Sequence, residues 1–130
     1  MLDINIGAAI LAAVSSFMLG GLWYSPVLFG KKWIKETEFD EANAGHPAKV
    51  FGLSFIFALM AAFGFAIVIG PQPDMMTAIY HAILIGIMFV ATSFGINYQF
   101  SNKSFSLFFI DAGYHVCQFI TYAVILGAWH

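Results

Sequence analysis

The sequence predicts an all-α protein, an integral membrane bundle of four transmembrane helices. Only 9% of its 130 residues are charged and 61% are hydrophobic, and the mean hydropathy is +0.85. Soluble domains carry about 25% charged residues, and a domain this short buries only about two thirds of the surface that its unfolded chain exposes. The apolar residues also gather in four long runs, so the expected solvent for them is lipid.

The four runs cover residues of about 4–24, 50–70, 75–99 and 105–128, within a single membrane domain of residues 1–130. Each approaches or exceeds the roughly 20 residues that a helix needs to cross about 30 Å of hydrocarbon. Continuous runs of this length favour helices, because the strands of membrane barrels show short alternating patterns. The first run follows Asp3 without a preceding lysine or arginine, so we expect a retained span and not a cleaved signal peptide.

The lysines predict the orientation of the spans. Lys31, Lys32, Lys35 and Lys49 lie between the first and second runs, and Lys103 lies between the third and fourth. Loops rich in Lys and Arg stay on the cytoplasmic side of a membrane. We therefore expect both lysine-bearing loops in the cytoplasm and both termini outside.

The loop of residues 30–49 is the one sizeable hydrophilic segment, and it predicts a short helix. Trp33, Ile34 and Thr37 could form a face that lies on the membrane surface, and a solvated helical connector is the equal alternative. Lys32 and Glu36 stand four residues apart, as side chains that pair on one helix face do.

Small residues recur every fourth position in the runs, and residues four apart share one face of a helix. Such faces let helix backbones approach closely in lipid. We expect a tight bundle and self-association into a homo-oligomer. The two longest series are Ala8, Ala12, Ser16 and Gly20 in the first run, and Ser54, Ala58, Ala62, Ala66 and Gly70 in the second.

The last run carries a polar stripe. Asp111, Tyr114, His115, Gln118 and Tyr122 follow one another at spacings of three and four, which places them on one helix face. With a tight turn near Lys103, Asp111 would lie level with Thr92 and Ser93 of the third run, and Asn97 nearer the loop side. At 1.5 Å per residue, Asp111 would be about 10 Å inside the membrane boundary.

A carboxylate at that depth costs several kcal/mol unless it is compensated. Three arrangements would compensate it. Asp111 could be protonated, because desolvation disfavours the charged form. It could accept hydrogen bonds from Ser93, Thr92, Tyr24 or Asn97, or it could pair with His115 as an imidazolium one turn away.

Several classes of function are excluded or disfavoured. The net charge of −2 and the absence of arginine argue against nucleic-acid binding, and the single cysteine, Cys117, excludes an internal disulfide or CxxC motif. His81 and His115 would lie about 10 Å apart along the bundle, too far to share a haem, and we expect His81 near the outer surface, bonded to Tyr122 or water. No metal and no cofactor is predicted, and membrane lipid is an expected partner.

Three stretches of the sequence resemble a known family. "LGGLWYSPVLFGKKWIK" (residues 19–35) and "LFFIDAGYHVCQF" (107–119), with "SFGINYQF" (93–100) between them, resemble the signature segments of the small bacterial membrane proteins called domain of unknown function 1761. The resemblance implies a four-span protein of the bacterial cytoplasmic (inner) membrane. It carries no established activity and transfers no catalytic residue. It singles out Trp23, Tyr24, Ser25, Pro26, Asn97, Asp111, Tyr114 and His115.

The residues leave three classes of function open. The first is a small transporter or a proton- or ligand-binding protein with a buried Asp–His site, and the second is a structural or assembly protein whose polar cluster only clamps helices. The third is a membrane enzyme acting on a lipid or quinone-like substrate. No catalytic residue is assigned. The candidate binding residues are Asp111, His115, Tyr114, Asn97, Gln118, Ser93, Trp23 and Tyr24.

Overall fold

The structure, a computed structural model, describes residues 3–130 and is helical throughout its regular parts. The first, second and fourth spans are α1 (Ile6–Trp23), α3 (Pro47–Ile69) and α6 (Phe105–Ala128). The third span, Met75–Phe100, consists of α4 (Met75–Ile85), a π-helical segment η2 (Gly86–Ala91) and α5 (Thr92–Phe100). The loop holds α2 (Gly30–Thr37) and a 3-10 turn, η1 (Glu41–Asn43). All four spans are long and apolar enough to cross a membrane, which confirms the predicted fold class.

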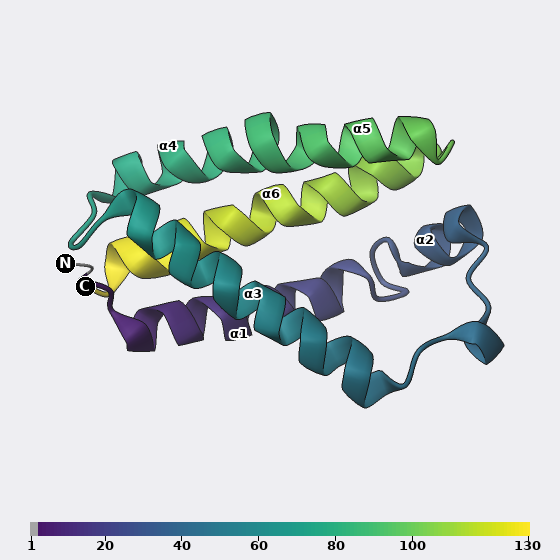
Figure 1. Cartoon of the computed structure of the whole chain (residues 1–130), viewed down its shortest axis with the longest axis horizontal. Coiled ribbons are helices and arrows are strands. Elements are labelled where there is room, and N and C mark those ends of the chain that lie inside the picture. Colours follow the sequence, from purple (N-terminus) through teal and green to yellow (C-terminus); the bar gives the residue numbers. More distant parts are fainter. Residues whose placement is uncertain (1–2) are drawn as a thin grey trace.

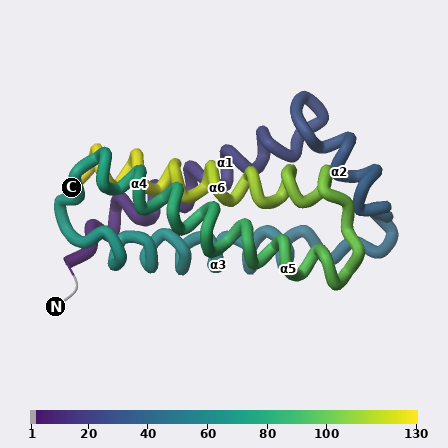
Figure 2. Tube along the Cα trace, turned by 90° about the horizontal axis from the view of Figure 1, so that it is seen from above, coloured from purple at the N-terminus to yellow at the C-terminus, as the bar shows by residue number. Residues whose placement is uncertain are grey.

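The fourth span is the centre of the bundle. Helix α6 packs against α1 on one side and against α4 and η2 on the other, and α3 packs mainly on α1 (Figure 1). Seen from above, the third span runs obliquely across α6 (Figure 2). The C-terminus, the start of α1 and the α3–α4 turn lie at one end of the bundle. Helix α2 and the α5–α6 turn lie at the other, which we call the loop end.

Polar residues begin the helices. The side chains of Asn5, Asp74 and Ser104 accept hydrogen bonds from the backbone N–H groups of Ala8, Thr77 and Leu107. Each bond satisfies one of the N–H groups that a helix start leaves without a partner. The apolar runs therefore become helices with defined first turns.

The bundle core is built from small side chains, as the spacing of alanines predicts. Ala8 and Ala12 of α1, Ala62 of α3 and Ala82 of α4 are fully buried. Most of the large apolar residues point outward, and the third span has the smallest buried share of the four. In a membrane these outward side chains contact lipid, since close backbone approach and not side-chain size holds such helices together.

A tight turn leads from α1 into α2. The backbone N–H of Phe29 donates to the carbonyl of Trp23 (3.0 Å), and that of Gly30 donates to the carbonyl of Ser25 (2.9 Å). A Cβ atom on Gly30 would lie 2.3 Å from the Tyr24 carbonyl oxygen. Only glycine fits there, and the turn places α2 next to the loop end of α6.

Candidate functional site

The carboxylate of Asp111 lies where three segments meet. Asp111 is only 8% exposed, and its Oδ1 accepts a hydrogen bond from the Tyr24 hydroxyl at 2.7 Å. Its Oδ2 accepts one from the Tyr98 hydroxyl. Tyr24 follows α1 and Tyr98 lies on α5. Of the three arrangements considered for Asp111, the structure provides hydrogen bonding, with Tyr24 as one of the donors.

Both donors are phenols, which carry no positive charge. A phenol has an ordinary pKa of about 10, so Tyr24 keeps its proton near neutral pH and acts as a donor to the carboxylate. The negative charge of an ionised Asp111 is stabilised by hydrogen bonds at this point, without a salt bridge to His115.

The third span presents Tyr98 to Asp111, whereas the sequence predicted Ser93, Thr92 or Asn97. Ser93 and Thr92 donate to carbonyls of their own helix, at Phe89 (2.7 Å) and Met88 (2.9 Å). Ser93 and Asn97 are exposed. These two predicted site residues are therefore not part of the cluster.

The π-helical segment η2 explains this difference. A π turn closes its hydrogen bonds at i→i+5 and takes in an extra residue compared with an α turn. Every side chain beyond it is rotated relative to a continuous α-helix. Phe94 and Tyr98 consequently face α6, where a regular helix would present Ser93 and Asn97. The segment lies where Gly86 approaches α6, with an added Cβ only 3.1 Å from the Val116 Cα atom.

The corner after α1 supplies further contacts to α6. The indole N–H of Trp23 donates to the Ile110 carbonyl (2.9 Å), and the Tyr114 hydroxyl donates to the Ser16 carbonyl (2.9 Å). Tyr114 lies against Gly20, where a Cβ would be 3.1 Å from its hydroxyl oxygen. Trp23, Tyr24 and Tyr114, all predicted site residues, thus join α1 to α6 around Asp111.

His115 belongs to a second chain of hydrogen bonds. Its Nδ1 lies 2.5 Å from Gln118 Oε1, while Gln118 Nε2 donates to the Tyr122 hydroxyl at 2.6 Å. Tyr122 in turn donates to the Ala58 carbonyl of α3 at 3.0 Å. Because Gln118 Oε1 only accepts, Nδ1 of His115 carries a proton. Among residues 3–130, no hydrogen bond joins Asp111 to His115.

The histidine of the third span, His81, lies apart from both hydrogen-bond networks. His81 Nδ1 contacts the Thr77 carbonyl of its own helix at 2.8 Å, and Tyr122, its expected partner, bonds elsewhere. Across residues 3–130, no group of three or more His, Cys, Asp or Glu side chains has the geometry to hold a metal ion. The two networks together contain one carboxyl, four phenols, one imidazole and one carboxamide.

The cluster is closely packed. Within the described part of the chain, every buried polar side-chain atom has a hydrogen-bond partner. A pocket of about 20 Å³ lies between the termini and the α3–α4 turn, and one of about 40 Å³ lies at the loop end beside Tyr98, Lys103 and Phe108. Neither is lined by Asp111 or His115. Space of this size holds water molecules and no larger ligand.

Residues 8–127 match a protein family model described as "Protein of unknown function (DUF1761)". The match covers nearly the whole chain and includes all the residues of both hydrogen-bond networks. The search of curated proteins and the search of solved structures found no match.

Proposed function

Since the chain belongs to the DUF1761 family of proteins of unknown function, we propose a function from its own site: it is a multi-pass membrane protein that binds and releases a proton at Asp111. The observation that carries the proposal is the environment of this carboxyl. It lies in the fourth span, is 8% exposed, and is held by two uncharged phenols.

The depth of Asp111 in the fourth span makes the ionisation of its carboxyl depend on local solvation. It stands seven residues after Ser104, the residue that caps the start of the span, or about 10 Å along the helix. Ionisation there has a desolvation cost that the phenols reduce but do not neutralise.

The two phenols can form hydrogen bonds with the Asp111 carboxyl in either of its protonation states. An ionised Asp111 accepts from Tyr24 and Tyr98. A protonated Asp111 would donate to one phenolic oxygen and still accept from the other, because a phenol both donates and accepts. Proton uptake therefore changes the contact between α1, α5 and α6, because the phenol that accepts from the carboxyl must direct its own proton to another acceptor.

A structural clamp is the second candidate, and the complete hydrogen bonding of the cluster favours it. In that case Asp111 keeps one protonation state and only ties the end of α1 and α5 to α6. The two candidates share the same contacts and differ in whether the carboxyl titrates.

The Asp111→Asn variant separates the two candidates, because it removes the titration and keeps the size of the side chain. We expect the thermal unfolding midpoint of the wild type in detergent to vary with pH, and the variant to lose this dependence. In the infrared spectrum, the pH-dependent change of the protonated-carboxyl band should be smaller in the variant, which lacks the Asp111 carboxyl and keeps the other Asp and Glu side chains. Asp74→Asn is the matched control, since asparagine caps a helix as well as aspartate does and Asp74 lies in the exposed turn before α4.

A wild type whose unfolding and infrared spectrum show no titration that depends on Asp111 would favour the clamp. In that case Asp111→Asn should lower the midpoint equally at every pH. Coupling of the proton to a transported solute extends the first candidate and requires a second, more open conformation. Proteoliposomes carrying an internal pH-sensitive dye, with Asp111→Asn as the control, would detect the proton movement.

We also propose a location, an orientation and an oligomeric state. The family resemblance implies the bacterial cytoplasmic membrane, the lysines favour an orientation with both termini outside, and the small-residue faces favour a homo-oligomer. The hypothesis of a lipid- or quinone-acting enzyme needs a cavity beside His115. The two pockets described above lie elsewhere, so no observation favours that hypothesis.

A further inference from the structure

Helix α2 is held at the level where the spans end. The Ser104 hydroxyl, which belongs to the residue before α6, donates to Glu36 Oε2 at 2.7 Å. On the N-terminal side of α2, the Phe29 N–H donates a hydrogen bond to the Trp23 carbonyl, which fixes the turn before α2 to the end of α1. Residues 25–37 therefore lie beside the ends of two spans, where hydrocarbon gives way to lipid headgroups.

This segment exposes apolar side chains outside the spans. Val27 is 83% exposed and Ile34 is 51% exposed. Leu28 and Phe29 are also exposed. Trp33, in contrast, turns inward and packs edge-on against Tyr24, with ring centroids 6.0 Å apart. These exposed apolar side chains lie level with the membrane boundary, as do side chains that insert among the upper acyl chains.

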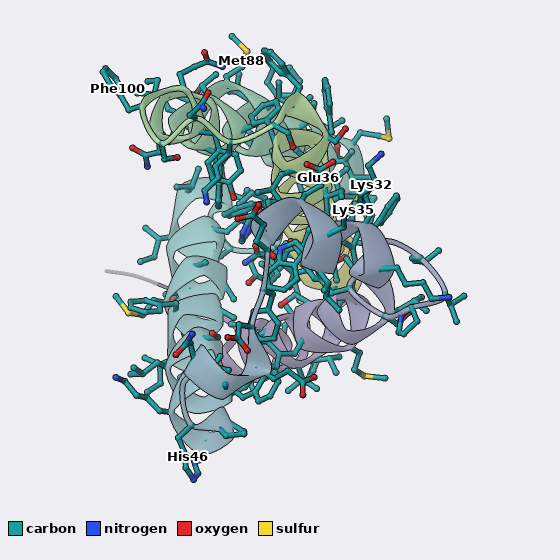
Figure 3. The ribbon with its side chains drawn as sticks, turned by 90° about the vertical axis from the view of Figure 1, so that its right-hand side faces the viewer. Lys32, Lys35, Glu36, His46, Met88 and Phe100 are labelled. Atoms are coloured by element: carbon teal, nitrogen blue, oxygen red, sulfur yellow. The ribbon has the colours of Figure 1, made fainter. Side chains whose placement is uncertain are left out.

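Lysines are interleaved with these apolar residues. Lys31, Lys32 and Lys35 of α2 are exposed. Glu36, the predicted partner of Lys32, accepts the hydrogen bond from Ser104 through Oε2. Figure 3, a view onto the loop end, shows Lys32 and Lys35 close together, while His46 lies at the far edge. Of the acidic residues, Glu36 lies in α2 and Glu38 directly follows it, whereas Asp40 and Glu41 belong to the linker that leads away from α2.

We propose that residues 27–35 bind the headgroups of anionic phospholipids, with the lysines of α2 contacting phosphate and Val27, Leu28 and Ile34 contacting the upper acyl chains. An amphiphile with a negative head matches both features of the surface. A Lys ammonium is a compact charge suited to phosphate, and cationic groups beside a span are attracted to anionic leaflets. The inference goes beyond proton binding at Asp111 and does not depend on it.

The test measures lipid retention and stability of the full chain. The protein in neutral detergent is titrated with phosphatidylglycerol or with phosphatidylcholine, bound lipid is counted by native mass spectrometry, and the thermal unfolding midpoint is recorded. We expect phosphatidylglycerol to be retained and to raise the midpoint, and phosphatidylcholine to do neither. In the variant K31Q/K32Q/K35Q the apparent affinity for phosphatidylglycerol should fall by about tenfold or more.

Two further variants locate the site. K49Q/K103Q removes the other two lysines of the loop end and should bind phosphatidylglycerol as the wild type does. Val27→Ser should weaken retention, because it removes an acyl-chain contact and leaves the charges in place. Equal losses in the α2 variant and in K49Q/K103Q would overturn the proposal, since they would mean attraction by charge alone.

Inorganic phosphate serves as the probe for a headgroup without chains. The proposal predicts that it raises the midpoint far less than phosphatidylglycerol at equal concentration, and equal stabilisation would overturn it. Asp111→Asn should retain phosphatidylglycerol like the wild type. This variant separates a failure of the lipid proposal from a failure of the proton proposal.

Discussion

Tyr98 and Asp111, 13 residues apart in the sequence, are hydrogen-bonded across the turn that joins the third and fourth spans. Together with Tyr24 on the opposite side of the same carboxyl, Tyr98 makes Asp111 a junction between three segments. Tyr98→Phe removes one donor and keeps the ring that packs against Phe94. We expect a loss of about 1.5–3 kcal/mol in the free energy of unfolding, the range for hydrogen bonds to charged groups.

Chemical unfolding in detergent measures the effect of Tyr98→Phe. Tyr80→Phe is the matched control, because Tyr80 lies on the same span and is 63% exposed. A loss for Tyr98→Phe no larger than that for Tyr80→Phe would contradict the role of Tyr98. In the double variant Tyr24→Phe/Tyr98→Phe the two losses should not add, since both phenols share one carboxylate.

Gly30→Ala should disturb the corner between α1 and α2. The new methyl group would meet the Tyr24 carbonyl oxygen at 2.3 Å, so the backbone must shift and move Tyr24 away from Asp111. We expect a lower unfolding midpoint and faster tryptic cleavage at Lys31, Lys32 and Lys35. Gly21→Ala is the control: nothing lies within 4 Å of its added Cβ, and alanine is favoured over glycine in a helix by about 1 kcal/mol. Equal midpoints for the two variants would argue against the tight corner.

Gln118→Leu tests whether the two hydrogen-bond networks are separate. Gln118 is 6% exposed and joins His115 to Tyr122. Its loss leaves Nδ1 of the half-buried His115 without its acceptor and removes one of the bonds to Tyr122, at a cost of about 1–3 kcal/mol. The titration of Asp111 should stay unchanged in the infrared spectrum, because its side-chain partners among residues 3–130, Tyr24 and Tyr98, lie outside this network. Gln99→Leu is an exposed control, and a shifted Asp111 titration in Gln118→Leu alone would mean that the networks are coupled.

Cysteine labelling tests the orientation of the spans. In a Cys117→Ser background, Asn43→Cys places a thiol in the lysine-bearing loop and Gln72→Cys places one in the α3–α4 turn. Both positions are exposed and lie at opposite ends of the bundle. The lysine distribution predicts that a membrane-impermeant reagent labels Gln72→Cys from outside intact cells and reaches Asn43→Cys only after lysis. The reverse pattern would contradict this orientation.

The number of spans, the helical class and the polar face of α6 follow from composition and periodicity. Runs of about 20 apolar residues partition into lipid as helices whatever their neighbours. The spacing of Asp111, Gln118 and Tyr122 places them on one face of any α-helix. Tyr24 was also predicted as a donor to Asp111, because Pro26 ends α1 close to the level of Asp111.

Contacts between helices decided which side chains complete the site. Residue-by-residue register across two helices depends on the rotation accumulated along both, and the π turns of η2 change that rotation in the middle of the third span. That span is apolar on nearly all its faces, so no hydrophobic stripe marks the change, and Tyr98 takes the place expected for Ser93 or Asn97. The division of Asp111 and His115 into two networks also arises from packing, since Tyr24 and Tyr98 hold the carboxylate while Gln118 turns the imidazole towards Tyr122.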